Sequence, residues 1–365
     1  MNIEAINNHN FIEACKYGSF DTVKSFLDDK RINPAEQNNK AFISACRDGK
    51  ADIVKLLLND NRINPADQNN LAFILACRYG YFNTVKLLLN DKRINPANEN
   101  NNAFIYACRY GYFDIVKLLL NDKRINPADQ NNLAFISACL EGKTDIVKLL
   151  LNDKRINPAD KNNLAFISAC EYGNLKIVKL LLKDKRINPA DKNNLAFISA
   201  CEYGQLKTVK LLLNDKRINS ADQNNLAFIS ACINGKIDIV KLLLKDKRIN
   251  PADQDNYAFI YACREGNFDI VKLLFNDKRI NPFDQNNLAF IHACRYGYVN
   301  IIKLFIEKNI YCFDFDYNSK EELYFLKKIY PNFKENIKSF FKNIKEEEII
   351  SKLDMSLIKN NISVF

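Results

Sequence analysis

The cysteines are the residues in this sequence whose type and spacing could most readily support chemistry. Ten of the 11 cysteines recur at intervals of 31 residues, and Cys312 lies outside the series. Regularly spaced thiols could form disulfides or, together with His9 and His292, ligate zinc. The periodic cysteines are Cys15, Cys46, Cys77, Cys108, Cys139, Cys170, Cys201, Cys232, Cys263 and Cys294.

The spacing argues against both kinds of bond. If the segments that carry these cysteines are helices packed side by side, neighbouring thiols belong to helices roughly 8–10 Å apart. A disulfide needs Cα atoms within about 7 Å of each other, and the sequence contains no Cys-x-x-Cys pair. We therefore predict no metal site and assign the cysteines to packing between helices. So many unpaired thiols also favour a reducing compartment.

The sequence provides few residues for catalysis. Two histidines cannot supply a base to every repeat, and neither a glycine-rich phosphate loop nor a Ser/His/Asp set is present. No apolar stretch of about 18 residues predicts a membrane helix, and the first residues lack the features of a signal peptide. We expect no enzyme, no catalytic residue, no cofactor and no membrane partner, and we place the chain in the cytoplasm with the nucleus left open.

Two columns of basic residues carry much of the formal net charge of +10, because lysines and acidic residues are equal in number from Phe313 onward. Cations just beyond a helix complement the negative end of its dipole, which is the interpretation that we prefer. The alternative is a stripe that follows the phosphates of a nucleic acid. The columns are Lys24, Lys55, Lys86, Lys117, Lys148, Lys179, Lys210, Lys241, Lys272 and Lys303, and Arg31, Arg62, Arg93, Arg124, Arg155, Arg186, Arg217, Arg248 and Arg279.

The positions of glycine and proline show how the repeated segment is built. All ten glycines lie three residues after a periodic cysteine, and eight of the nine prolines form a column from Pro34 to Pro282 that Ser220 interrupts. Registration of three residue types at one period indicates a tandem repeat, so a division of the chain by length alone would mislead.

One repeat covers residues 131–161. Asn131-Asn132 is a polar turn and helix-cap signal, and Leu133–Glu141 predicts a short apolar helix that Gly142 ends in the left-handed conformation. Lys143–Leu151 predicts a second helix, and the proline after it favours an extended loop. Two such short helices cannot bury a core alone, so neighbouring copies must stack into a solenoid.

This arrangement of two short helices and a projecting loop resembles the ankyrin-repeat family. Ala138-Cys139-Leu140-Glu141-Gly142 is similar to the family's Ala-Ala-x-x-Gly, and Asp145–Leu151 is similar to its Ile-Val-x-Leu-Leu-Leu second helix. Ile156-Asn157 followed by Asp160 resembles the loop motif Val-Asn-Ala-x-Asp. The chain departs from the family at the start of the first helix, where Leu133–Ile136 stands in place of Thr-Pro-Leu-His, and its unit is two residues shorter than the usual 33.

The resemblance recurs ten times over residues 8–312. It implies an all-α fold, an ankyrin-repeat solenoid of about ten stacked helix-turn-helix units, and a module that binds another protein. The Asn-, Lys- and Ile-rich composition resembles that of ankyrin arrays from giant amoeba-infecting viruses and social amoebae, which would place the chain in the host cytoplasm if it is viral.

The family resemblance also points to a binding surface. In ankyrin repeats the two residues before the glycine face a concave groove, and the loop tips flank it. Here this variable pair changes between basic and acidic while the scaffold columns scarcely change, and tyrosine and arginine dominate binding hot spots. Neutral drift at exposed sites is the alternative. The candidate partner-binding residues are Lys16, Tyr17, Arg47, Arg78, Tyr79, Arg109, Tyr110, Glu171, Tyr172, Glu202, Tyr203, Arg264, Arg295 and Tyr296.

The two ends of the chain depart from the period. Residues 1–7 form a short N-terminal lead, and the first repeat has polar residues typical of a cap. Residues 313–365 predict helices at Glu321–Tyr330, Lys334–Lys345 and Glu346–Leu357. This C-terminal tail is either a cap on the last repeat or a docking segment for a second partner.

These patterns favour a protein–protein interaction scaffold or adaptor that acts as a monomer and binds one other protein. Two alternatives stay open. The chain could be a substrate adaptor that recruits a ubiquitin-ligase complex through its tail, or its basic columns could form a surface that binds nucleic acid or other phosphates.

Overall fold

The computed structural model describes residues 3–308, and these contain helices and no strands. Residues 309–365, with Cys312 and the three helices expected in the tail, lie outside the described residues. We number the repeats by their periodic cysteines, from Cys15 in repeat 1 to Cys294 in repeat 10.

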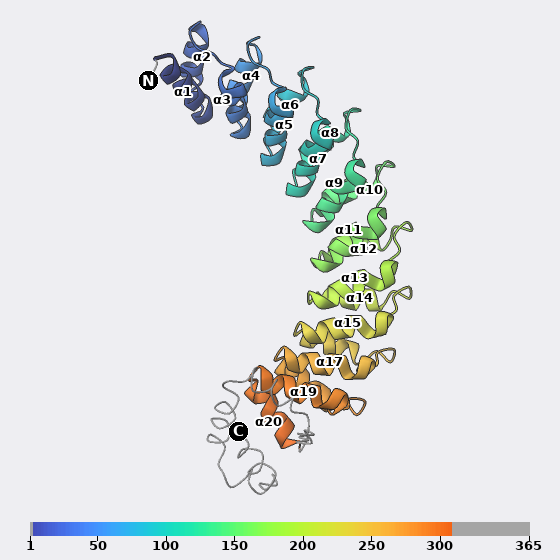
Figure 1. The fold of residues 1–365 in the computed structure, drawn as a ribbon. Coiled ribbons are helices and arrows are strands. Elements are labelled where there is room, and N and C mark those ends of the chain that lie inside the picture. The colour runs from blue at the N-terminus through green and yellow to red at the C-terminus, as the bar shows by residue number, and fades with distance from the viewer. Residues whose placement is uncertain (1–2, 309–365) are drawn as a thin grey trace. The chain divides into compact units, whose positions relative to one another are not determined.

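Each repeat consists of a first helix, a second helix and a loop that projects beyond the second helix (Figure 1). The first helices are α1 (Ile3–Tyr17), α3 (Glu36–Arg47), α5 (Asp67–Tyr79), α7 (Asn98–Tyr110), α9 (Asp129–Leu140), α11 (Asp160–Glu171), α13 (Asp191–Glu202), α15 (Asp222–Ile233), α17 (Asp253–Arg264) and α19 (Asp284–Arg295). The second helices are α2 (Phe20–Asp28), α4 (Ala51–Leu58), α6 (Phe82–Leu89), α8 (Phe113–Leu120), α10 (Thr144–Leu151), α12 (Leu175–Leu181), α14 (Leu206–Leu213), α16 (Ile237–Leu243), α18 (Phe268–Phe275) and α20 (Val299–Glu307).

The repeats form two compact units. The first contains the described residues up to Ala200 together with Lys207–Ile218, and the second contains Cys201–Leu206 and the described residues from Asn219 onward. In the first unit successive first helices pack on one another from α1 to α11, and successive second helices do so from α2 to α12. In the second unit α15, α17 and α19 pack in order, as do α16, α18 and α20. The expected all-α solenoid of stacked helix pairs is confirmed within each unit.

The core lies between the helices of adjacent repeats. In repeat 5, Phe135 of the first helix and Val147 and Leu150 of the second helix are 0% exposed. The periodic cysteines from Cys15 to Cys263 are buried free thiols. Burial raises the pKa of these thiols, to about 12 for Cys15, so they remain protonated and fill space as small apolar groups. This agrees with the packing role expected from the sequence.

From α3 onward, the first turn of each first helix has a more unusual backbone than the sequence indicated. Gly142 follows α9 with a φ of +70°, as expected, but Gln130, Asn131 and Asn132 also have positive φ, between 51° and 61°. Left-handed backbone costs roughly 1–2 kcal/mol per residue other than glycine, with asparagine the most tolerant. Three such residues in succession persist only where the surrounding structure holds them.

Asn132 shows what holds this turn. It is 2% exposed, its Nδ2 donates to Asp160 at the start of α11, and its Oδ1 accepts the backbone N–H of Asn157 at 3.3 Å. The capping role expected for Asn131-Asn132 is therefore wrong for Asn132, because its hydrogen bonds run to the loop that leads into the next first helix. Equivalent pairs are Asn39–Asp67, Asn101–Asp129, Asn163–Asp191, Asn225–Asp253 and Asn256–Asp284.

Candidate protein-interaction surface

The variable pair lies at the carboxyl end of each first helix, just before the glycine turn. α5 ends at Tyr79 and α7 ends at Tyr110, and the glycine after each has positive φ. All the predicted partner-binding residues reach the surface: their tyrosines, Arg78 and Arg295 are exposed, and the others are half-buried. The left-handed glycine directs the chain away from the helix and leaves these side chains uncovered.

In repeats 1 and 2 the charges of the variable pair are balanced locally. The Nζ atom of Lys16 lies 3.5 Å from a carboxylate oxygen of Glu13. In repeat 2 the guanidinium of Arg47 binds the neighbouring Asp48 at 2.9 Å, and this hydrogen bond lowers the pKa of the Asp48 carboxyl. A partner would have to displace an existing contact at either position.

Repeats 3 and 4 differ, because arginine there contacts rings. The guanidinium of Arg78 lies 5.8 Å from the ring centre of Tyr79 and 5.3 Å from that of Tyr106, on the next first helix. The rings of Tyr106 and Tyr110 stack at 6.2 Å. Two further tyrosines, which follow the glycine turns, extend the series at 6.5 and 6.4 Å. We call these residues the aromatic–arginine cluster: Arg78, Tyr79, Tyr81, Tyr106, Tyr110 and Tyr112.

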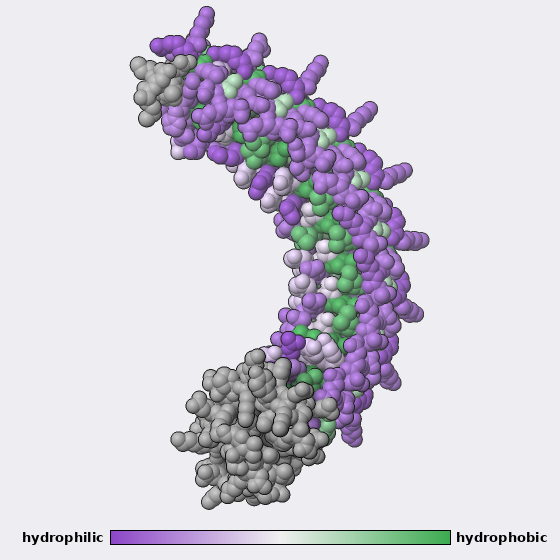
Figure 2. Space-filling model, viewed as in Figure 1, coloured by the Kyte–Doolittle hydropathy of each residue, from purple (hydrophilic) through white to green (hydrophobic). Residues whose placement is uncertain are grey.

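Exposed aromatic side chains adjoin this cluster. Tyr79 and Phe82 flank one glycine turn and are 46% and 39% exposed, and Tyr110 and Phe113 flank the next and are 41% and 40% exposed. Figure 2 shows that the visible surface is mainly hydrophilic and that hydrophobic residues reach it in a narrow band. Exposed tyrosines also occur in other repeats, so repeats 3 and 4 are distinguished by carrying an exposed tyrosine and an exposed phenylalanine in two adjacent repeats.

Repeats 5 and 6 present a different surface at the same positions. Ser137 and Ser168 take the place of Tyr106, and the variable pairs become Leu140-Glu141 and Glu171-Tyr172. Glu141 lies 3.8 Å from Arg109 of repeat 4, so the border between the basic and the acidic segments is itself an ion pair. The surface at the variable pair is therefore basic and aromatic in repeats 3 and 4, and acidic in repeats 5 and 6.

The second unit contains a related arrangement in repeats 9 and 10. The guanidinium of Arg264 lies 5.0 Å from the ring centre of Tyr261 and 3.7 Å from Glu265. His292 is 9% exposed, and its Nδ1 has no hydrogen-bond partner among the described residues. Burial, followed by the charges of Arg295 and Arg264, lowers the pKa of His292, which favours its neutral form.

Two columns that contribute to this surface were missed in the sequence. The residue five positions before each glycine changes from Tyr106 to Ser137 and returns to tyrosine at Tyr261. The residue after the glycine is tyrosine in repeats 3 and 4. In repeat 6 this residue is Asn174, whose Nδ2 donates to the carbonyl oxygens of Cys139 and Leu140 at 2.8 Å. The sequence signal for these columns was that their residue types vary from repeat to repeat. Tyr106 could have been linked to Tyr110 because residues four apart on a helix are neighbours.

The arginines of the column form hydrogen bonds within the protein. Arg155 binds Asp153 through two nitrogens, at 3.0 and 2.6 Å, and its Nη1 donates to the carbonyl oxygen of Ile125 in the preceding loop at 3.1 Å. Arg62 also reaches the carbonyl oxygen of Leu27 at the end of the preceding second helix. The contact of Arg62 with Leu27 agrees with the expectation that these cations complement a helix end, although the helix belongs to the preceding repeat. The same carbonyl bond is made by Arg62, Arg93, Arg124, Arg186, Arg217 and Arg279.

The lysine column is exposed in every repeat, as expected. Lys148 forms an ion pair with Asp145 at 3.0 Å. The phosphate-binding alternative therefore rests on lysines along the second helices, while the aromatic rings of repeats 3 and 4 lie at the ends of the first helices and around the glycine turns that follow them. Strong binding of single-stranded nucleic acid combines cations with stacking rings on one surface.

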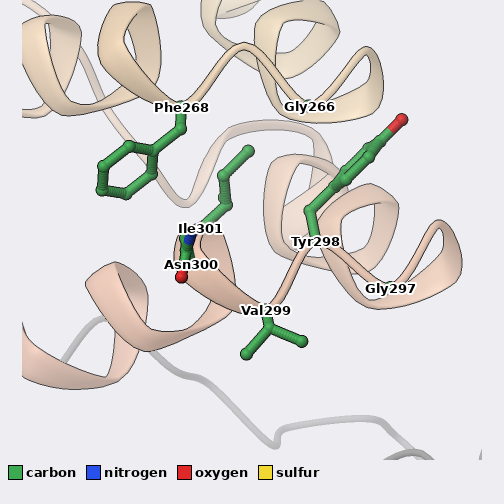
Figure 3. A pocket seen from close by; sticks show the side chains of 7 residues that line it. All are labelled: Gly266, Phe268, Gly297, Tyr298, Val299, Asn300 and Ile301. Atoms are coloured by element: carbon green, nitrogen blue, oxygen red, sulfur yellow. The ribbon is translucent and has the colours of Figure 1, made fainter.

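A pocket of about 260 Å³ lies in the second unit. Figure 3 shows its lining, in which Tyr298 and Phe268 extend from the two glycine turns. The residues that line it are Gly266, Phe268, Gly297, Tyr298, Val299, Asn300 and Ile301. Within residues 3–308, His, Cys, Asp and Glu nowhere gather in a group of three that could hold a metal ion. Over the same residues, every helix is too short or too polar to cross a bilayer.

Comparison with known proteins agrees with this architecture. The family model for ankyrin repeats matches overlapping stretches at residues 11–100, 61–131, 104–193, 135–227, 166–255 and 228–320. A comparison with curated protein sequences finds no match. Because the matched stretches cover most of the chain, and because the described helices stack in pairs, the chain belongs to the ankyrin-repeat family.

Proposed function

We propose that this chain is a scaffold or adaptor that binds another protein through the variable pairs of its first helices and the adjoining loop tips. Ankyrin repeats are generally protein-interaction modules. The observation that carries the proposal is the exposure of Arg78, Tyr79 and Tyr110 on a scaffold whose other columns repeat with little change. Tyrosine and arginine are enriched among the few residues that contribute most to binding at protein interfaces.

Binding rather than catalysis is the activity that the residues support. The periodic thiols are buried and their pKa values are raised, whereas a nucleophilic cysteine needs a lowered pKa and access to substrate. The same unpaired thiols support a reducing compartment, for which we propose the cytoplasm. The proposed unit of function is a monomer with one protein partner.

The proposal can be tested by affinity purification and mass spectrometry with the full chain. We expect a variant with Arg78, Tyr79, Arg109 and Tyr110 replaced by alanine to lose proteins that the wild type retains, because the replaced side chains form the centre of the surface. The matched control replaces four exposed lysines of the second helices, which are Lys55, Lys86, Lys117 and Lys148.

Circular dichroism of both variants establishes that the helices are retained. The same set of bound proteins for the first variant and the wild type would exclude this segment as the binding surface. Loss of partners in the lysine variant alone would move the binding surface to the second helices.

A further inference from the structure

We propose that the aromatic–arginine cluster of repeats 3 and 4 binds a segment of a partner protein in which acidic residues alternate with large apolar residues. A carboxylate of that segment binds the guanidinium of Arg78, and its apolar side chains pack against Tyr79 and Tyr110. This inference rests on the proposed function and adds the chemistry of the partner at one part of the surface.

Arg78 is the residue that selects a carboxylate. Its Cζ atom lies 5.8 Å from the ring centre of Tyr79 and 5.3 Å from that of Tyr106, and among the described residues it makes no hydrogen bond or ion pair. The edge of a guanidinium presents donors in a planar fork that matches a carboxylate. Arg47 and Arg109, its counterparts in the adjacent repeats, already have Asp48 and Glu141 as partners.

The neighbouring rings provide the apolar part of the site. Tyr106 and Tyr110 stack four residues apart on α7, and the two exposed phenylalanines, Phe82 and Phe113, begin the adjoining second helices. Tyrosines held against one another lose little conformational entropy when a ligand covers them. Exposed aromatic area beside an unpaired guanidinium therefore fits a segment in which acidic and large apolar residues alternate.

The surrounding charges favour a protein segment over a nucleic acid. Asp48 lies in repeat 2, Glu141 in repeat 5 and Glu171 in repeat 6, so carboxylates border the cluster along the first unit. Asp48 and Glu141 offset the charges of Arg47 and Arg109, so a polyanion that continued past repeats 3 and 4 would gain little from these variable pairs, and its affinity depends on the number of phosphates that cations neutralise. A short segment with one or two carboxylates can bind within the cluster and does not need further cations.

The test is the binding of synthetic peptides to the full chain, measured by fluorescence anisotropy. One labelled peptide alternates glutamate and phenylalanine, and a second of equal length replaces each glutamate with lysine. We expect the wild type to bind the acidic peptide about tenfold or more tightly than the lysine peptide, and we expect Arg78→Glu to lower that preference by about tenfold or more.

The matched control is Lys86→Glu, which makes the same change of charge in the same repeat but on the exposed side of α6. We expect it to leave the preference for the acidic peptide unchanged. Thermal unfolding of both variants shows that neither loses its fold, and Arg78→Lys, which keeps the charge but not the planar fork, should bind with intermediate affinity.

Several results would overturn the inference. Equal affinity of the wild type for the two peptides would contradict a preference for an acidic partner. Equal effects of Arg78→Glu and Lys86→Glu on peptide binding would contradict a binding site at Arg78. Tighter, Arg78-dependent binding of an oligothymidine would assign the cluster to nucleic acid instead. If the four-alanine variant loses partners while Arg78→Glu leaves peptide binding intact, the proposed function stands and only the acidic chemistry fails.

Discussion

The loop side of each repeat and the exposed end of its first helix differ in how far they vary. On the loop side, Asp153, Arg155 and Asn132 have equivalents in almost every repeat, and Arg155 and Asn132 form hydrogen bonds with neighbouring repeats. At the first-helix end, Arg78-Tyr79 becomes Glu171-Tyr172 within the same unit. The hydrogen bonds between repeats and the surface that we propose for partner binding thus lie on two separate sides of one repeat, so one side can change without weakening the other.

The single break in the proline column shows how strictly the loop side is maintained. Ser220 replaces proline, and its hydroxyl donates to Asp246 at 2.8 Å. Asp246 also binds Arg248, and the hydrogen bonds from Arg248 and then Ser220 lower its pKa to about 2. The substitution therefore adds a contact to the Asp–Arg pair, whereas no such constraint is visible at the variable pair.

The largest effect is expected for Asn132→Ala on the loop side. The change leaves the Asp160 carboxylate and the N–H of Asn157 without their buried partner, so we expect the free energy of unfolding to fall by about 2–4 kcal/mol. Urea unfolding measures it. The matched change on the other side is Tyr172→Ala, which removes a side chain that is 57% exposed and should alter stability by less than about 0.5 kcal/mol. Similar losses for the two variants would contradict the division between the sides.

A smaller effect is expected for Arg155→Ala, with Arg31→Ala as its control. Arg155 bonds both Asp153 and the carbonyl oxygen of Ile125, while Arg31 pairs only with Asp29 and its side chain is 78% exposed. We expect a loss of about 1–2 kcal/mol for Arg155→Ala and a smaller loss for Arg31→Ala in urea unfolding. Equal losses would mean that the Asp–Arg pair alone carries the stabilisation.

The smallest effect per repeat is expected from titration of the Asp–Arg pairs. The hydrogen bond from Arg155 lowers the pKa of Asp153 in the folded state. A lowered folded pKa stabilises the protein above the unfolded pKa of about 4, and this contribution is lost as the pH falls through the folded value. We expect stability to decline as the pH falls below about 4, and the deficit of Asp153→Asn relative to the wild type to shrink as it does so. A deficit that stayed constant with pH would show that the Asp153 charge is not involved.

Much of the fold follows from local patterns. Gly142 predicts a left-handed residue at the end of a helix, the apolar residues from Ile146 to Leu151 predict the second helix, and the structure has both. The packing role of Cys139 was also predictable, because the 31-residue spacing of the cysteines argued against disulfides and zinc ligation. The candidate surface was predicted only in part: the variable pair was identified, while Tyr106 was missed because a single repeat gives no reason to distinguish it from a core residue.

The sequence by itself determined the 31-residue period, the glycine turn that ends each first helix and the column in which the surface varies, because these depend on residues close together in the chain. Only the tertiary structure decided that Asn132 binds Asp160, that Arg155 binds the carbonyl of Ile125, and that Arg78 lies beside Tyr106. Such pairs are about one repeat apart, so their contact depends on the offset between stacked repeats. That offset results from the packing of whole helices against one another, which no local pattern of residues specifies.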